Sequence, residues 1–416
     1  MILILSEEVI NKVVERLVAR VEDGNEFILK NIGHTMDEMG TLTNTQTHQL
    51  AQIMQYGGDY DKIVKKISEI TKVNTKEVEE LFNEVAKNNY EFAEQFYKYR
   101  NKKFIPYEQN EALKRQVQAI AKMTNDQYKN IIGSMAFSRI GKNGRVYYTK
   151  IGKMYQEIVD TGVVSISQGK QTFDEEMYRI IKELGESGIR SVDYESGKSM
   201  RVDTAVRMHL KDAVTRLHNE TQEIYGKEFG ADGIEVSVHL NPAPDHALVQ
   251  GKQFSDEEFK KFQNDEDSTS YDGTFFPAEA EETGHDRRSI GQYNCYHKIF
   301  PIILGASKPD YTDEQLQEIL DKNNEGFKFE GKHYTNYEGT QLQRKLETRI
   351  REEKDKQILA KASGNEEAKE IIDKSQQKIT ELTKKYRDLS KASGLPTYME
   401  NLRVSGYKRV AKNKLK

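Results

Sequence analysis

The chain has 416 residues, enough for two or three domains, and 31% of them are charged against 36% hydrophobic, a polar balance for one large globule. This composition favours several small cores joined to long, solvated helices. The formal net charge of -4 excludes an overall basic field that would attract nucleic acid, and a single cysteine excludes an intramolecular disulfide and suits a reducing cytosol.

No segment has the pattern of a targeting or membrane-spanning sequence. The apolar stretch Met1–Leu5 is too short for the apolar core of a signal peptide and is not preceded by basic residues. No apolar run approaches the ~20 residues that a membrane span needs. We therefore expect a soluble protein that is made in the cytoplasm and has no contact with a membrane.

Residues 6 to about 135 are expected to be helical. Ser6 can cap the first helix, and apolar residues then recur every three or four positions. Gly57 and Gly58 are predicted to interrupt the pattern. Asn74 and Glu77 have the spacing of a capping box, which predicts the start of a further helix. The first apolar stripe consists of Ile10, Val13, Val14, Leu17, Val18 and Val21.

Residues from about 136 to 305 mix short strand and helix patterns and are expected to form a small α+β module. Thr172 with Glu175, and Ser255 with Glu258, have capping-box spacing and predict two helix starts. Alternating apolar and polar residues at 233–239 predict a half-buried strand. In chain order, we expect a strand at 146–148, a helix at 172–184, a strand at 189–194, a helix at 202–225, the strand at 233–239, a short helix after 255 and a last strand at 296–304.

Residues 306–416 are expected to be helical again and to end in a basic tail. A break at Gly364 divides the segment into two helices, and the apolar residues of the second recur with heptad spacing. A helical hairpin or an antiparallel coiled coil is therefore predicted. The tail from Lys408 to Lys416 is rich in Lys and Arg; such a tail is usually solvated, and contact with DNA or an acidic partner is the alternative. The heptad positions are Ile372, Ile379, Leu382, Tyr386 and Leu389.

These patterns predict a predominantly helical α+β fold with three regions, at 1–135, 136–305 and 306–416. The chemistry-bearing residues concentrate in the middle region, where six of the nine histidines accompany the only cysteine. No nucleotide-binding glycine motif and no HExxH zinc motif occurs. The remaining candidates for a site are His239, His246, Cys295 and His297.

Three interpretations of these four residues stay open. They have the donor types of a zinc site, although one thiolate and the Cys295-x-His297 spacing do not match a standard zinc finger. Cys295 with His246 or His297 also has the residue types of a thiol nucleophile and its base. The simplest interpretation is that His246 and Cys295 are buried, hydrogen-bonded residues of the fold. We therefore predict no catalytic residue, no metal and no cofactor.

An ordered set of short motifs resembles the phage minor capsid protein 2 family of tailed phages and prophages, which is related to the Mu F-like head morphogenesis proteins. The chain departs from the family pattern at Asp245, where serine is common, at Val249, where tryptophan is common, and at Tyr296, where arginine is common. The matching segments are Val164–Gly169; Gly188–Lys198, with Asp193, Tyr194 and Gly197; Val202–Arg207, with Asp203 and Arg207; His239–Gly251, with His239, His246, Gln250 and Gly251; Asn294–His297, with Asn294, Cys295 and His297; Tyr337–Glu347, with Tyr337, Glu338, Gln341 and Arg344; and Ser393–Pro396.

The resemblance implies a structural protein of the virion and not an enzyme. Such a protein would be present at low copy in the phage head, at the portal or head–tail vertex or inside the capsid, and would be made in the cytoplasm of the bacterial host. Its partners would be the portal and other capsid proteins, with residues 1–135 as a docking region and the basic tail beside packaged DNA. The alternatives are a virion-carried metal- or thiol-dependent enzyme centred on His246, Cys295 and His297, and a coiled-coil adaptor of the host.

Overall fold

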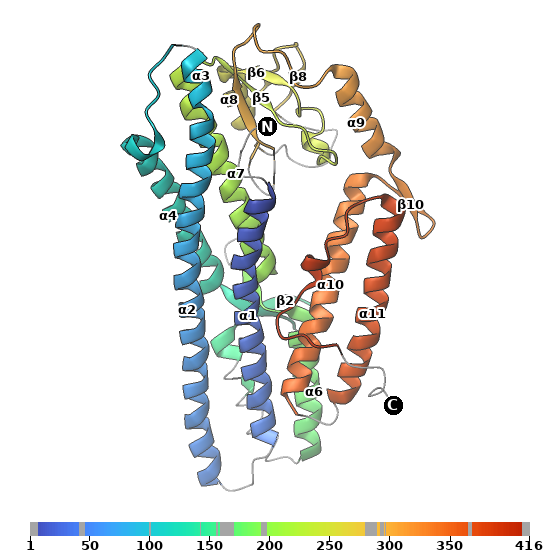
Figure 1. The fold of residues 1–416 in the computed structure, drawn as a ribbon. Helices are drawn as coiled ribbons and strands as arrows, with labels where there is room; N and C mark the ends of the chain where they lie inside the picture. Colours follow the sequence, from blue (N-terminus) through green and yellow to red (C-terminus); the bar gives the residue numbers. More distant parts are fainter. Residues whose placement is uncertain are drawn as a thin grey trace. The chain divides into compact units, whose positions relative to one another are not determined.

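A computed structural model describes residues 7–40, 46–99, 101–141, 143–154, 157–158, 170–192, 198–278, 289–291, 295, 297–364 and 368–409 (Figure 1). Long helices predominate and the sheets are small and antiparallel, so the predicted fold class is confirmed. The described residues form two compact units. Unit 1 draws on Met1–Glu15, Thr75–Gln127 and Arg207–Gly339, and unit 2 on Arg16–Asn74, Tyr128–Val206 and Thr340–Lys416.

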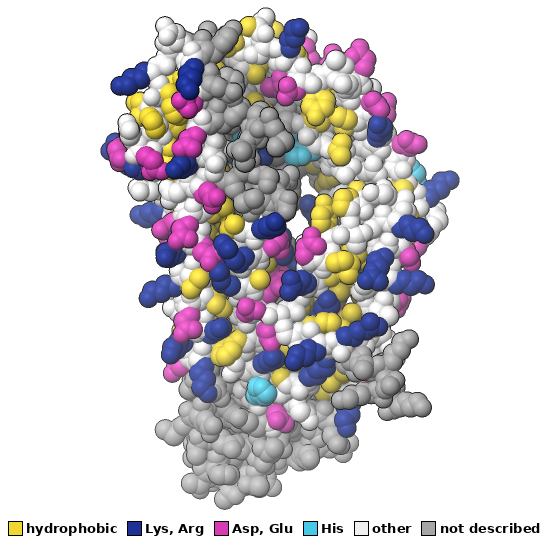
Figure 2. Space-filling view, in the orientation of Figure 1, with side chains coloured by type: hydrophobic (Ala, Val, Ile, Leu, Met, Phe, Trp, Pro, Cys, Tyr) yellow, Lys and Arg dark blue, Asp and Glu magenta, His cyan; other side chains and the backbone are white. Residues whose placement is uncertain are grey.

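The charged third of the sequence lies largely at the surface. On the face shown in Figure 2, basic and acidic side chains are interspersed over most of the view. None of the described helices is both long and apolar enough to cross a membrane.

The N-terminal helices are longer than the sequence patterns predicted. Helix α1 runs over Glu7–Gly40 and α2 over Gln46–Phe92, followed by α3 at Glu94–Tyr99 and α4 at Glu111–Gly133. The predicted interruption at Gly57 and Gly58 is wrong, because α2 continues through both residues. A helical glycine costs roughly 1 kcal/mol relative to alanine, which a helix of this length tolerates.

Asn74 does not cap a helix, which corrects a second prediction. It lies inside α2, and its buried side chain connects three helices of the chain. Its Oδ1 accepts a hydrogen bond from Arg20 at 3.2 Å, and its Nδ2 donates to the carbonyl oxygen of Leu17 at 3.1 Å and to the Tyr128 hydroxyl at 2.8 Å. The amide is therefore used in tertiary bonds, and the sequence spacing that resembled a capping box was coincidental.

Unit 2 contains a four-stranded antiparallel sheet in the order β2-β1-β3-β4. The predicted strands at 146–148 and 189–194 are confirmed as β2 and β3, although residues 193–197 lie outside the described residues. Helix α6 is already helical at Lys170, so the helix start predicted at Thr172 is wrong. The bounds are β1 Met135–Ile140, β2 Val146–Lys150, α6 Lys170–Ser187, β3 Arg190–Val192 and β4 Ser199–Arg201.

The C-terminal helices of unit 2 form the predicted hairpin. Helix α10 covers Asn336–Ala362 and α11 covers Ala368–Ser393, with Gly364 at a φ of +60° after the first helix. Gln343 Nε2 donates to Ser390 Oγ at 2.8 Å, and the Tyr386 hydroxyl donates to Glu347 at 3.0 Å. These pairs run in opposite directions along the chain, which makes the helices antiparallel. Three of the five heptad positions are buried, namely Ile379, Tyr386 and Leu389.

Unit 1 contains a three-stranded antiparallel sheet in the order β6-β5-β9, with α8 packed beside it. Ser255 caps α8 as predicted, because its Oγ accepts a hydrogen bond from the backbone N–H of Glu258 at 3.2 Å. The bounds are α7 Val202–Phe229, β5 Gly233–Val236, β6 Gln253–Ser255, α8 Asp256–Gln263, β7 Ser268–Thr269, β8 Phe275–Phe276, β9 Ile299–Ile302, α9 Asp313–Glu325, β10 Phe327–Phe329 and β11 Lys332–Tyr334.

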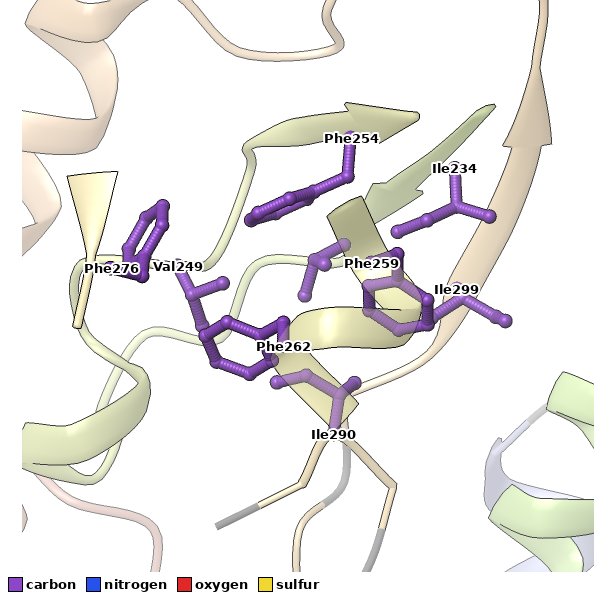
Figure 3. Close-up of a cluster of buried hydrophobic side chains, with 9 residues drawn as sticks. Ile234, Val249, Phe254, Phe259, Phe262, Phe276, Ile290 and Ile299 are labelled. Carbon is purple, nitrogen blue, oxygen red and sulfur yellow. The ribbon is translucent and has the colours of Figure 1, made fainter. Parts of the chain in front are cut away.

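Aromatic side chains form the core around the β6-β5-β9 sheet of unit 1. Figure 3 shows Phe254 of β6, Phe262 of α8 and Phe276 of β8 pointing toward one another. The centroids of these three rings lie 5.6–5.9 Å apart. Val249 is part of the same buried cluster. The core fixes the positions of the loop before β6 and the segment before β9, and these two segments carry the candidate site.

Candidate functional site

The loop between β5 and β6 brings the first histidine of the site inward. A short 3-10 helix at Pro244–His246 begins with proline, which needs no N–H partner there, and the backbone N–H of His246 bonds to the Ala243 carbonyl at 2.9 Å. The N–H of Gln250 then bonds to the carbonyl of His246 at 3.2 Å. The turn directs the His246 imidazole into the protein, where it is only 1% exposed.

The second part of the site precedes β9. The backbone N–H of Ser237 donates to the Lys298 carbonyl at 2.8 Å, and the Ser237 hydroxyl accepts from the Lys298 N–H at 2.8 Å. These bonds fix Lys298, the residue after His297, against Ser237 directly after β5. Cys295 and His297 are both 3% exposed.

The two segments bring one thiol and two imidazoles together. The Sγ of Cys295 lies 3.3 Å from Nδ1 of His246 and 3.4 Å from Nδ1 of His297. The candidate ligand atoms of the three residues lie within 4.8 Å of one another. The two imidazole rings are nearly perpendicular, with centroids 5.2 Å apart. We call these three residues the His–Cys cluster.

Oxygen atoms face the outer nitrogen of each imidazole. The Nε2 of His297 lies 3.4 Å from Oε1 of Gln250, and the same oxygen accepts the backbone N–H of His239 at 2.9 Å. The Nε2 of His246 lies 3.8 Å from Oδ2 of Asp245, whose side chain is 5% exposed. Gln250 is within hydrogen-bond distance of the outer nitrogen of His297, whereas Asp245 is close to that of His246 but beyond hydrogen-bond distance. Both Nδ1 atoms face Cys295.

His239 lies at the edge of the cluster. Its ring centroid is 4.4 Å from that of His297, but it does not join the group of mutually close ligand atoms. It is half-buried, whereas the three members of the cluster are buried. The sequence candidates thus divide into three residues that the fold brings together and one that borders them.

The burial of Cys295 bears on the enzyme alternative. A thiol nucleophile needs a partly exposed position that a substrate can reach. A pocket of about 470 Å³ does occur in unit 1, between α7, α8 and the sheet, and it is lined by residues such as Glu223, Asp256 and Lys260. No side chain of the His–Cys cluster lines that pocket.

The other family-motif residues have structural contacts of their own. Asp203 is buried in an ion-pair network of unit 2, and Arg207 forms a bidentate ion pair with Glu15 in unit 1, at 2.8 and 2.9 Å. Glu338 accepts the N–H of Thr335 at 2.8 Å in a capping box at the start of α10.

The remaining motif residues do not join the cluster. Tyr337 donates its N–H to Asn323 at 3.1 Å, Gly251 has a φ of +73°, Gln341 is half-buried and Arg344 is exposed. Asp193, Tyr194, Gly197 and Asn294 lie outside the described residues, as does His285.

Sequence reasoning missed the partners that complete these sites. Arg201, Arg351 and Asp355 bind Asp203 or one another inside unit 2, yet in sequence they resemble ordinary surface charges. Asp245 was noted only as a departure from a family pattern. Its position directly before His246 in a proline-rich turn is the one local signal that could have suggested a role beside the imidazole.

Fold and site together define a predominantly helical α+β protein with a buried His–Cys cluster. The family model described as phage minor capsid protein 2 matches residues 5–391. The chain therefore belongs to the phage minor capsid protein 2 family, which confirms the resemblance inferred from its motifs. Comparisons with curated proteins and with solved structures gave no match.

Proposed function

We propose that the protein is a structural minor capsid protein that is present at low copy in the head of a tailed phage or prophage. The observation that carries the proposal is the family match over residues 5–391, nearly the whole chain. In this role the protein is located at the portal or head–tail vertex, or inside the capsid, and its partners are the portal and other capsid proteins. It acts by binding and not by catalysis.

The three regions of the chain have separate parts in this proposal. The helical region 1–135 docks on the portal or capsid, and the hairpin region 306–416 carries the basic tail. Residues 136–305, predicted as a central module, contribute to both compact units. Long helices with interspersed charges, as in Figure 2, suit binding to larger assemblies and give no broad basic face on the side in view. Contact with packaged DNA is assigned to the tail from Lys408 onward.

The direct test is to purify phage particles and quantify this protein by mass spectrometry against the major capsid protein. We expect a copy number far below that of the major capsid protein. Absence from both mature particles and procapsids would refute the proposal. Cross-linking of intact particles then tests the partners, and we expect cross-links from residues 1–135 to the portal or to a neighbouring capsid protein.

Separate variants test the assignment of DNA contact to the basic tail. Removal of residues 410–416 is expected to leave incorporation into procapsids unchanged and to reduce cross-linking to DNA in filled heads. Replacement of the tail lysines by glutamine is the matched control, because it keeps the length and removes the charge. Equal DNA cross-linking by all three proteins would contradict the assignment of the tail.

A further inference from the structure

We propose that the His–Cys cluster binds one zinc ion through Nδ1 of His246, Sγ of Cys295 and Nδ1 of His297, and that this ion fastens the β5–β6 loop to the segment before β9. The proposal is independent of the proposed function, because it concerns the isolated chain. It revises the expectation from sequence that the protein binds no metal.

The donor atoms of the His–Cys cluster suit zinc. One thiolate and two imidazoles form a set that zinc prefers over magnesium or calcium, which take oxygen ligands. The three atoms already lie within 4.8 Å of one another, so an ion can contact all of them with small side-chain rotations. They come from two segments whose separation in sequence is 49 residues, between His246 and Cys295.

The protons available at the Cys295 sulfur also favour a metal ion. Two Nδ1 atoms face Cys295, at 3.3 and 3.4 Å. A neutral thiol has one proton and can donate it to only one of them. If either Nδ1 carried the proton instead, its Nε2 would present a lone pair to an oxygen. A metal ion removes the conflict, because it accepts a lone pair from the sulfur and from both nitrogens.

The oxygens behind the rings support this assignment of protons. Gln250 Oε1 accepts the His239 backbone N–H at 2.9 Å, which identifies it as the oxygen of the amide. It therefore also faces His297 Nε2 as an acceptor, at 3.4 Å, and the Asp245 carboxylate lies 3.8 Å from His246 Nε2, beyond hydrogen-bond distance but near enough for its charge to favour a proton there. This arrangement favours protons on both Nε2 atoms, which leaves both Nδ1 atoms as metal ligands. An oxygen behind each ligating imidazole is the usual second layer of a zinc site.

The charges balance around the ion. Zinc and one thiolate together carry a net charge of +1, and the nearly buried Asp245 carboxylate beside His246 supplies the compensating charge. Binding releases one proton, from the Cys295 thiol. The cluster offers three protein ligands, one fewer than the usual structural zinc site. All three ligands are buried, which gives a substrate no route to the ion, so we assign the ion a stabilising role.

The test measures metal content of the full chain, purified without a polyhistidine tag. We expect one zinc per chain by elemental analysis, a lower melting temperature after removal with a chelator, and recovery when zinc is added. Cobalt(II) added to the zinc-free protein is expected to give a thiolate-to-cobalt absorption band in the near ultraviolet. Cys295→Ser should abolish that band and the bound zinc.

Two further variants separate a built site from non-specific zinc. Asp245→Asn keeps the ligands and the size of the side chain, and it is expected to weaken zinc binding 10- to 100-fold. His218→Ala is the matched control, because His218 is a buried histidine of the same unit outside the cluster, and it should retain one zinc. Wild-type protein without zinc and without a melting response to zinc would overturn the proposal. So would a Cys295→Ser variant that keeps full zinc content.

Discussion

The two units of the molecule bury polar groups in different ways. In unit 2, Arg201 and Arg351 are paired with Asp203 and Asp355, so two positive and two negative charges neutralise one another within the chain. In unit 1, the His–Cys cluster brings two imidazole nitrogens to one thiol. The first set is balanced in charge, although the buried Nε of Arg351 has no hydrogen-bond partner among the described residues. The second places one thiol, which carries a single proton when neutral, opposite two imidazole nitrogens, and this difference is the basis for proposing a metal in the His–Cys cluster and none in the ion-pair network.

The ion network depends on close packing as well as on charge. Arg201 donates from Nη1 to Asp355 at 2.7 Å and from Nε to Asp203 at 3.2 Å, and Arg351 donates to the other Asp203 oxygen. A Cβ atom at Gly188, which has a φ of +61°, would lie 2.4 Å from Nη1 of Arg201. This contact gives a physical reason for glycine at that position, and the bonds of Asp203 give one for an aspartate in its motif.

The largest expected effect is the loss of Asp203. Asp203→Ala leaves two buried arginines without their shared partner, and removal of one member of a buried pair typically costs about 3–5 kcal/mol in the free energy of unfolding. Urea unfolding measures this loss. The control is Glu176→Ala, which breaks an exposed pair with Arg179 in the same unit and should cost less than about 1 kcal/mol. Similar losses in both variants would show that the buried ion pairs of Asp203 contribute no more stability than an exposed ion pair.

The next effect concerns the His–Cys cluster. With free zinc at 100 times its dissociation constant, the bound ion contributes about 2.7 kcal/mol to the free energy of unfolding, and a chelator should remove that contribution. Hydrogen exchange should then become faster in β9 of unit 1 and remain unchanged in β1 of unit 2. The Cys295→Ala variant is expected to show no response to the chelator. Faster exchange in both strands would mean that the ion does not act locally.

Acid provides a third comparison between the units. Burial, with a smaller contribution from Lys298, lowers the pKa of His218 from 6.5 to about 3, so the folded protein keeps this imidazole neutral. The unfolded chain binds a proton below pH 6.5, and stability is therefore lost as the pH falls from 6.5 toward 3, by about 1.4 kcal/mol per pH unit. Above pH 6.5 both states are neutral and the group has no effect.

His218→Phe tests this pH dependence and retains a ring against Phe300. Between pH 7.5 and pH 5, wild-type protein is expected to lose about 2 kcal/mol more stability than the variant. Urea unfolding at both pH values measures the difference, with both proteins freed of metal so that acid-induced metal loss does not contribute. Parallel losses would show that His218 takes up its proton in the folded state.

Local patterns in the sequence predicted only part of the local structure. The Ser255 cap, the strand at 146–148 and the break at Gly364 depend on residues within a few positions, and all three are confirmed. Asn74 was misread because its role depends on distant partners. An asparagine can cap a helix or connect several, and only the positions of Leu17 and Tyr128 decide which.

The candidate site could be predicted in its residue types but not in its arrangement. His246, Cys295 and His297 were candidates from the sequence, as was His239, yet nothing local separates them from His218, which is buried elsewhere in unit 1. What selects the three is the turn at Pro244–His246 and the two bonds of Ser237 to Lys298, which bring segments about fifty residues apart together. The proton count that favours a metal depends on Gln250 and Asp245, and their orientation exists only in the fold.

The smallest expected effect concerns Glu338. It tests whether the carboxylate of Glu338 is needed only for the capping box or also for binding a partner. Thr335→Ala removes the hydroxyl that accepts the Glu338 N–H at 3.1 Å, and loss of such a cap costs about 1 kcal/mol in the free energy of unfolding. Glu338→Gln should cost less, because glutamine can still accept the Thr335 N–H. Thermal melting compares the two variants. If Glu338→Gln melts like wild type but enters particles poorly, the carboxylate binds a partner and the cap is secondary. If both variants enter particles normally, the capping box alone explains glutamate at this position.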